Sequence, residues 1–286
     1  MKHTEKGTLV LDGKFVAQEM QNTIKKKIDD ACVEITLATV LVGDDKPSQL
    51  YVNNKHKQAT ASSIHVNLSG DISQKELEDK ITELGNDASI NGILIQMPLP
   101  KGLNEDSIIE MIPTNKDVDG LKEQNLGKLI VGNDVLRPCT PLGVMKLIKY
   151  YNLETSGKKA LVIGRSRLVG MPQVIMFGSK GVDCTVTLAH SRTKNLDELI
   201  SESEIVVPAI GVPNIINAKN VRKDAILLDV GISSDGKGIH GDVDFNGVDG
   251  IAKAVTPMPG GTGPMTVACL LENTMKAAQL QGIISK

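Results

Sequence analysis

The sequence predicts an α/β protein of two domains, each built on a parallel β-sheet. Short apolar runs of strand length alternate with longer amphipathic stretches along nearly the whole chain, as in parallel sheets covered by helices. The length of 286 residues suits two domains of ordinary size. A hydrophobic fraction of 41% supplies apolar side chains for both cores, which excludes a disordered or fibrous chain.

The first half of the chain contains three apolar runs that read as buried strands, with amphipathic stretches between them. The expected strands cover residues 34–43, 64–68 and 92–97. The expected helices cover residues 44–60, 74–86 and 104–111. Pro98 and Pro100 end the third strand, because proline has no N–H to donate to a sheet ladder.

The second half repeats this alternation. Its expected strands cover residues 159–164, 184–189, 204–211 and 225–232. Its expected helices cover residues 168–181, 196–201 and 265–282, the last with apolar residues at helical spacing and a terminating glycine.

The domain boundary is expected between Lys116 and Leu161, where a stretch rich in Gly and Pro has no clear period. A helix over 141–151 is expected to bridge the two halves. We therefore divide the chain into a first domain of residues 1–142, joined by the C-terminal helix 267–286, and a second domain of residues 143–266.

Composition excludes several classes of protein. A formal net charge of −2 and 2% aromatic residues argue against a nucleic-acid-binding protein, which needs a basic face and stacking rings. No apolar run approaches the ~20 residues of a membrane span, and the first residues lack the apolar stretch of a signal peptide. The cysteines are scattered, so neither a metal site nor disulfides are expected, and a cytoplasmic protein is predicted. They are Cys32, Cys139, Cys184 and Cys269.

A glycine turn follows the strand at 159–164 and precedes a helix. Such a turn directs helix N–H groups and the positive end of the helix dipole at a phosphate. The usual dinucleotide fingerprint is G-x-G-x-x-G. Here Gly164 and Arg165 are followed by Ser166 in place of the second glycine, and the last glycine is delayed to Gly170. By spacing alone, a tight turn with a purely structural role is the alternative.

The residues after the next strand favour NADP over NAD. A cofactor without a 2′-phosphate usually meets an acidic residue there, but His190 is followed by Ser191 and Arg192, and no acidic residue occurs before Asp197. A hydroxyl and a guanidinium suit an additional phosphate, and Arg165 adds a second cation. The alternative is an ordinary solvated loop.

Tyr51 and Lys55 are candidate reactive residues in the first half. Their spacing of four places them on one face of a helix. A lysine beside an aromatic ring and partly shielded from water can have its pKa lowered and act in proton transfer. An exposed helix surface is the alternative, because Tyr-x-x-x-Lys alone is a weak signal.

Three further positions are candidates for ligand binding. Gln96 ends a strand, where α/β folds collect ligand-binding groups. Asp119 could accept from the N–H donors of a heterocycle, although turns also favour Asp for local reasons. The loop 257–264, rich in Gly and Pro, could bring its backbone close to a ligand.

Taken together, these segments resemble the bifunctional methylenetetrahydrofolate dehydrogenase/cyclohydrolase family over nearly the whole chain. The matching stretches occur in the family's order, among them GILIQMPLP, HSRT, DVGI, GDVDF and TPMPGGTGPMT. They cover residues 41–57, 92–100, 113–120, 137–143, 162–172, 190–193, 229–232, 241–245 and 256–266. The resemblance implies a Rossmann-like NADP-binding second domain and an active-site cleft between the two domains.

The resemblance also implies residue roles. Lys55 is expected to be the catalytic lysine, with Tyr51 packed beside it over the folate, Gln96 orienting it and Asp119 anchoring the pterin. The substrate side further includes Gly260, Gly261 and Pro264 of the loop. The positions expected to hold NADP are Gly164, Arg165, Ser166, Ser191, Arg192 and Ile232. Thr262 departs from the family, in which Val is common at that position.

The expected activity is oxidation of methylenetetrahydrofolate to methenyltetrahydrofolate with NADP, followed by hydrolysis to 10-formyltetrahydrofolate. The resemblance implies tetrahydrofolate derivatives as substrates, a homodimer and no metal. The nearest alternative is a monofunctional dehydrogenase of the same family, using NADP or NAD. More distant alternatives are a two-domain NADP dehydrogenase such as shikimate dehydrogenase and a dinucleotide-binding regulatory protein.

Overall fold

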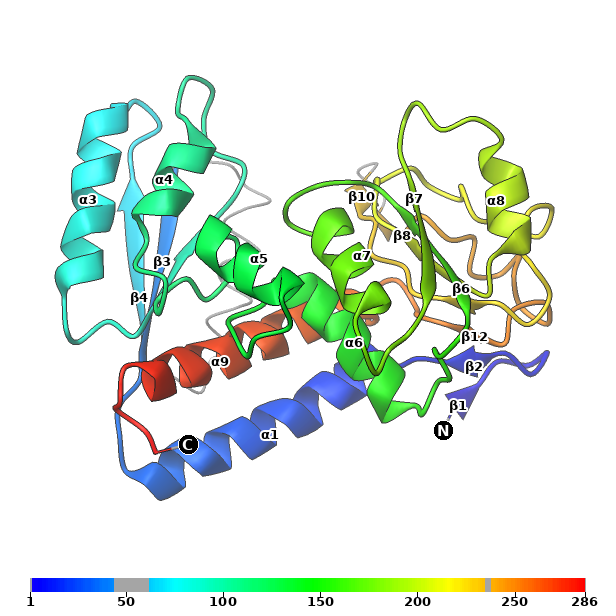
Figure 1. Cartoon of the computed structure of the whole chain (residues 1–286), viewed down its shortest axis with the longest axis horizontal. Coiled ribbons are helices and arrows are strands. Elements are labelled where there is room, and N and C mark those ends of the chain that lie inside the picture. Colours follow the sequence, from blue (N-terminus) through cyan, green and yellow to red (C-terminus); the bar gives the residue numbers. More distant parts are fainter. Residues whose placement is uncertain (1, 44–61, 235–237, 286) are drawn as a thin grey trace. The chain divides into compact units, whose positions relative to one another are not determined.

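The structure is a computed structural model that describes residues 2–43, 62–234 and 238–285 (Figure 1). The chain divides into two compact units. Unit 1 comprises Met1–Gln18 and Thr140–Thr266, and unit 2 comprises Glu19–Cys139 and Val267–Lys286. Within the described ranges, no helix is long and apolar enough to cross a membrane.

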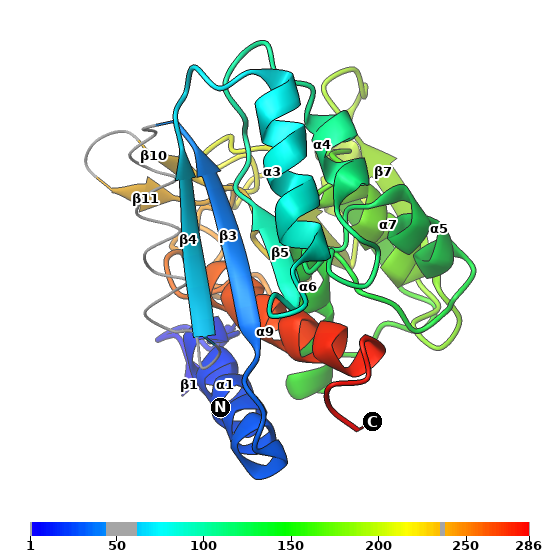
Figure 2. The same cartoon turned by 90° about the vertical axis from the view of Figure 1, so that its left-hand side faces the viewer.

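Unit 2 is built on a parallel sheet in the order β4-β3-β5 (Figure 2). The strands are β3 (Thr36–Val42), β4 (Ser62–Leu68) and β5 (Gly92–Ile95). The central strand β3 is buried along its entire length, as expected for a strand covered on both faces. This confirms the three strands predicted for the first half.

Helices cover both faces of this sheet. On one face, α3 (Gln74–Asn86) and α4 (Glu105–Met111) contribute Leu77, Ile81 and Ile108 to a core shared with the strands. Ser73 begins α3 with a capping box that pairs it with Glu76. In a second cluster, α1 (Gly13–Ala31) and α9 (Thr262–Leu280) pack together around the start of β3. The helix α5 (Glu123–Ile130) completes the unit.

Unit 1 contains a seven-stranded sheet in the order β1-β2-β12-β9-β8-β6-β7. The five strands from the second half run parallel: β6 (Lys159–Ile163), β7 (Thr185–Ala189), β8 (Ile205–Pro208), β9 (Ile226–Leu227) and β12 (Ala254–Val255). From β6 the chain proceeds to β7 on one side and then to β8 on the other. The Rossmann-like arrangement is thereby confirmed, with its topological switch point between β6 and β8.

The helices of unit 1 are α6 (Cys139–Tyr150), α7 (Gly170–Gly178) and α8 (Leu196–Glu202). Residues from α8, from β6 to β9 and from β12 form one hydrophobic core, which includes Ile200, Leu161 and Val255. The short strands β10 (Ser233–Ser234) and β11 (Ile239–His240) pair with each other outside the main sheet.

The N-terminal segment differs from the division made from sequence, which assigned residues 1–142 to one domain. In the structure, Met1–Gln18 belong with the second half of the chain. The reason is strand pairing: β2 (Leu9–Val10) runs parallel to β12, and β1 (Lys2–His3) pairs antiparallel with β2. Such short strands are difficult to recognise locally, because β2 pairs with a strand more than 240 residues away and β1 in turn pairs with β2.

Candidate functional site

The glycine turn after β6 has a backbone shape that only glycine permits at two positions. Gly164 has φ of +118°, and a Cβ there would lie 2.7 Å from the carbonyl oxygen of Ala209. A Cβ on Gly170 would lie 1.9 Å from the carbonyl oxygen of Gly164. The first turn of α7 therefore packs directly on the chain that leaves β6. This close approach, at a helix N-terminus beside the switch point, fits the pyrophosphate of a dinucleotide.

Ser166 stabilises the turn with its side chain. Its hydroxyl accepts a hydrogen bond from the N–H of Val169 at 3.1 Å, and its carbonyl accepts one from Met171. The serine that departs from the generic fingerprint thus bridges the turn. Arg165 is exposed beside it, where its charge remains available to an anion.

The turn after β7 is held by local hydrogen bonds. The N–H of His190 donates to Oγ1 of Thr193 at 2.9 Å, and the N–H of Arg192 donates to Nδ1 of His190 at 3.2 Å. The side chains of Ser191 and Arg192 are exposed. Because β6 and β7 are parallel neighbours, this turn and the glycine turn lie at the same edge of the sheet. A hydroxyl and two guanidinium groups at this edge suit the 2′-phosphate of NADP.

On the other side of the switch point, the edge of the sheet is apolar. Ile210 and Val212 follow β8 with 39% and 46% of their surface exposed, and Ile232 follows β9 with 56% exposed. These three residues, which we call the apolar ledge, adjoin the glycine turn: a Cβ on Gly164 would lie 3.3 Å from Cγ2 of Ile210. Exposed branched side chains at this edge suit the flat face of a ring.

Two buried aspartates lie behind the apolar ledge. Oδ2 of Asp242 accepts hydrogen bonds from the N–H groups of Ile210 and Gly211, and the carboxylate of Asp229 accepts from those of Asp242 and Val243. Burial raises the pKa of both carboxyl groups, that of Asp229 to about 7, while the N–H donors oppose the rise. Sequence reasoning assigned neither residue a role.

The Gly- and Pro-rich loop is shorter than the sequence suggested, because α9 begins at Thr262. Gly260 has φ of +108°, and its carbonyl oxygen accepts a hydrogen bond from the N–H of Lys14. A Cβ on Gly13 would lie 1.9 Å from the carbonyl oxygen of Gly261, so α1 begins directly against this loop. Pro264 lies in the first turn of α9, where proline is tolerated.

In unit 2, Gln96 and Asp119 follow two paired segments. Gln96 is half-buried directly after β5, with its side-chain amide donating to the carbonyl oxygen of Met97 at 2.8 Å. Asp117 forms a parallel β-bridge with Ile93 of β5. Gln96, which follows Ile93, and Asp119, which follows Asp117, therefore lie towards the same end of the sheet. Tyr51 and Lys55 lie outside the described residues.

Of the two aspartates in this segment, Asp117 has a structural role. Its carboxylate accepts hydrogen bonds from the N–H groups of Leu121 and Lys122 and from the side chain of Asn125. Burial raises the pKa of Asp117 despite these donors. Asp119 is only half-buried, which makes it the carboxylate that a ligand can reach.

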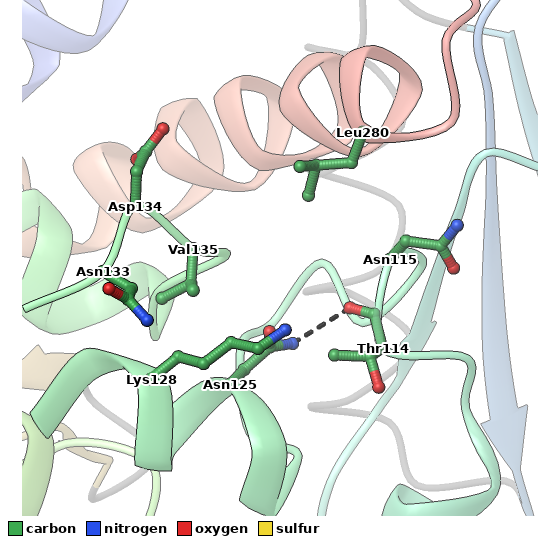
Figure 3. Close-up of a pocket in the computed structure, with 8 residues that line it drawn as sticks. All are labelled: Thr114, Asn115, Asn125, Lys128, Asn133, Asp134, Val135 and Leu280. Atoms are coloured by element: carbon green, nitrogen blue, oxygen red, sulfur yellow. Dashed lines mark hydrogen bonds between the residues drawn. The ribbon is translucent and has the colours of Figure 1, made fainter. Parts of the chain in front are cut away.

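Unit 2 contains a pocket of about 480 Å³. Figure 3 shows residues that line it. Asn125 donates to the carbonyl oxygen of Thr114 in its wall. Leu280 also lines it, and the next residue, Gln281, donates to the carbonyl oxygen of Asn91. Asn91 precedes β5 whereas Gln96 follows it, so the pocket lies towards the opposite end of that strand. No residue predicted from sequence as a site residue lines it.

Within the described ranges, no group of three or more His, Cys, Asp or Glu side chains is placed to hold a metal ion. None of the four cysteines, all of which lie in the described ranges, forms a disulfide.

Comparison with known proteins matches both halves of the chain to one family. Residues 11–119 match the catalytic domain of tetrahydrofolate dehydrogenase/cyclohydrolase, and residues 138–282 match its NAD(P)-binding domain. The bifunctional protein FolD of Lactococcus lactis subsp. cremoris is 45% identical over 278 residues, which cover 94% of this chain and 96% of the relative.

Solved structures show the same likeness. The FolD methylenetetrahydrofolate dehydrogenase/cyclohydrolase of Campylobacter jejuni has a TM-score of 0.93 at 39% identity, covering 96% of this chain and 100% of that one. The Trypanosoma brucei enzyme, complexed with NADP cofactor and inhibitor, has a TM-score of 0.91 at 30% identity, covering 96% and 98%. The dinucleotide turn, the arginines beside it and these matches over nearly the whole chain lead to one conclusion: the chain belongs to the tetrahydrofolate dehydrogenase/cyclohydrolase family.

Proposed function

We propose that this chain oxidises methylenetetrahydrofolate to methenyltetrahydrofolate with NADP and hydrolyses the product to 10-formyltetrahydrofolate. The observation that carries the proposal is the dinucleotide turn at the switch point of unit 1, with Arg165 and Arg192 exposed at the same sheet edge. Family membership over both halves of the chain supports both activities. Formation of NADPH from methylenetetrahydrofolate is the assay that tests it.

NADP is the cofactor, and bound NADP⁺ would supply the acceptor for the hydride that leaves the methylene carbon of the folate. The chain's own contribution to that step is binding and orientation. Backbone N–H groups of the glycine turn would hold the pyrophosphate, Ser191 and Arg192 would hold the 2′-phosphate, and Ile232 would contact the nicotinamide half. No strong base is needed, because the nitrogens next to the reacting carbon stabilise the cation that forms.

The folate is assigned to the first half of the chain together with the C-terminal helix. Asp119 accepts hydrogen bonds from the pterin, and Tyr51 packs over it. Lys55 takes a proton from the attacking water and delivers one to the ring nitrogen. Gln96 orients Lys55 without neutralising it, because an amide carries no charge at any pH. Gly260, Gly261 and Pro264 complete the substrate side.

Replacing Arg192 by Ala is expected to lower the preference for NADP over NAD by about tenfold or more, because a charge-assisted hydrogen bond to phosphate contributes about 1.5–3 kcal/mol. Ser191→Ala is expected to act in the same direction with a smaller effect. The ratio of kcat/KM for the two cofactors measures this.

Arg222 provides the matched control for Arg192. It is an exposed arginine of unit 1 whose guanidinium donates to the carbonyl oxygen of Glu202 and lies 3.9 Å from the carboxylate of Glu204, before β8 begins. It is therefore at the opposite end of the strands, and Arg222→Ala should leave the ratio unchanged. A wild-type enzyme that already prefers NAD would contradict the assignment of both Ser191 and Arg192.

Replacing Asp119 by Ala is expected to raise the KM for the folate substrate, since leaving buried pterin donors unpaired costs about 1–3 kcal/mol. The KM for NADP should change little. Steady-state kinetics with each substrate varied in turn distinguish the two. An unchanged KM for the folate would contradict the role of Asp119.

The protein is further proposed to be a cytoplasmic homodimer. Family resemblance supports the dimer, and four cysteines that form no disulfide agree with a reducing compartment. Light scattering on the purified protein should give twice the mass of one chain. A mass of one chain at all concentrations tested would contradict the dimer.

A further inference from the structure

Apart from Ile232, the residues of two motifs of unit 1 have no role in the account above: Asp229–Ile232 and Gly241–Phe245. In the structure they interlock. Oδ1 and Oδ2 of Asp229 accept hydrogen bonds from the N–H groups of Asp242 and Val243, both at 3.0 Å. The aspartate of the first motif therefore fixes the backbone of the second.

Each carboxylate also fills the space beside a glycine of the other motif. A Cβ on Gly241 would lie 1.9 Å from Oδ2 of Asp229, and a Cβ on Gly231 would lie 2.0 Å from Cγ of Asp242. Neither glycine has the left-handed φ that favours glycine, so close approach is the reason for glycine at both positions. We call this reciprocal arrangement of two aspartates and two glycines the clasp.

The clasp acts on the turn after β8. Oδ2 of Asp242 accepts from the N–H groups of Ile210 and Gly211 at 2.9 and 3.2 Å, and Asp242 is fully buried. Its Oδ1 finds no hydrogen-bond partner among the described residues, so Oδ2 alone makes these contacts. A Cβ on Gly211 would lie 3.1 Å from the carbonyl oxygen of Ile232. Asp242 thus fixes the backbone of the turn that carries Ile210 of the apolar ledge.

The side of the switch point indicates which half of NADP meets the ledge. The exposed Ser191 and Arg192 follow β7, on one side of the glycine turn, and suit the adenosine 2′-phosphate. The ledge follows β8 and β9, on the other side, where a dinucleotide that crosses the turn places its nicotinamide half.

We propose that Asp242 is a positioning residue for hydride transfer, which holds the turn at Ile210–Gly211 so that the apolar ledge orients the nicotinamide ring. This inference rests on the proposed dehydrogenase function. It goes beyond that function by giving the two motifs a role in positioning the nicotinamide ring. Asp242 contacts no reacting atom. It acts through the hydrogen bonds that its carboxylate accepts from the backbone N–H groups of Ile210 and Gly211.

A threonine at the start of α9 connects the clasp to the Gly-rich loop. The hydroxyl of Thr262 donates to the carbonyl oxygen of Asp229 at 2.7 Å, and Thr262 is 2% exposed. A valine at this position would have the same shape but no hydrogen-bond donor. Thr262 thus adds a buried hydrogen bond that links the start of α9 to the clasp.

The test compares Asp242→Ala with Asp242→Asn, measuring both activities. The alanine variant leaves two N–H groups without their acceptor, so the kcat of the dehydrogenase should fall about tenfold or more, with a smaller change in the KM for NADP. Hydrolysis of added methenyltetrahydrofolate needs no hydride transfer and should keep its rate. The asparagine variant retains a carbonyl oxygen as acceptor and should recover most of the dehydrogenase rate.

If the alanine variant does not fold, Thr262→Val and Thr262→Ser provide the second measurement. Loss of the hydroxyl should lower the dehydrogenase kcat several-fold, and serine should restore it. Thr274→Val is the matched control, because Thr274 is a buried threonine of the same helix whose hydroxyl donates within that helix, to Leu270.

Equal loss of both activities in every folded variant would overturn the proposal and indicate a merely structural role, as would an unchanged dehydrogenase kcat in Asp242→Ala. Absence of both activities from the wild-type protein would instead contradict the proposed function itself.

Discussion

Replacing Lys55 by Met is expected to abolish hydrolysis of methenyltetrahydrofolate while the protein remains folded. Hydrolysis requires removal of a proton from water and delivery of one to a ring nitrogen, and Lys55 is the residue assigned to both transfers. General acid–base catalysis typically contributes 10²–10⁴-fold, so a loss of at least about 100-fold is expected. Decay of the methenyl chromophore measures the rate.

The cationic substrate strengthens this expectation, because a positive charge beside an amine disfavours its ammonium form and keeps it able to accept a proton. A far-ultraviolet circular dichroism spectrum equal to that of the wild type serves as the folding control. A folded Lys55→Met variant that still hydrolyses the methenyl compound at the enzymatic rate would refute the assignment.

Replacing Gly170 by Ala is expected to disrupt NADP binding and destabilise unit 1. The new Cβ would lie 1.9 Å from the carbonyl oxygen of Gly164 and 2.8 Å from Cα of Arg165. Both are backbone atoms, so the turn itself must move. Overpacking of this kind typically costs about 1–3 kcal/mol, and a displaced turn no longer directs its N–H groups at the pyrophosphate.

Gly178 is the matched control, because it lies at the other end of the same helix, where a Cβ would meet only Cγ2 of Val186 at 4.0 Å. Gly178→Ala should therefore leave NADP binding unchanged. Titration with NADP and the midpoint of thermal unfolding measure the two effects. Wild-type NADP affinity in Gly170→Ala would contradict the assignment of this turn.

The elements that the sequence predicts well are those with a strong local period. The helix expected at 74–86 is α3 with the same bounds, because a capping box begins it and Leu77, Ile81 and Leu84 form one buried face. The strand expected at 225–232 is shorter, since β9 contains only Ile226–Leu227. The residues that follow leave the sheet: Asp229 and Gly231 belong to the clasp, and Ile232 belongs to the apolar ledge.

Two of the helices, α1 and α5, were not predicted from the sequence. The helix α1 begins after Asp12, whose carboxylate accepts from the N–H of Phe15, and it carries Ile24 and Ile28 at helical spacing, so a local signal was present. The helix α5 contains Gly127 and has no side-chain cap, and its position depends on tertiary packing.

Those parts of the candidate site that consist of a single continuous segment could be predicted from the sequence. The glycine turn with Arg165 and Ser166, and the loop with Ser191 and Arg192, lie at adjacent strand ends, as their order in the sequence indicated. The clasp was not predictable in this way. Asp229 and Asp242 are thirteen residues apart, and their contact depends on how the intervening chain folds back between β9 and β11.

The most direct test supplies the purified protein with methylenetetrahydrofolate and either NADP⁺ or NAD⁺, and follows NADPH or NADH together with the methenyl chromophore and 10-formyltetrahydrofolate. The account predicts rapid reduction of NADP⁺, a much slower reaction with NAD⁺, and conversion of the methenyl product to the formyl compound. No reduction of either cofactor would contradict the account, as would accumulation of the methenyl compound without enzymatic hydrolysis.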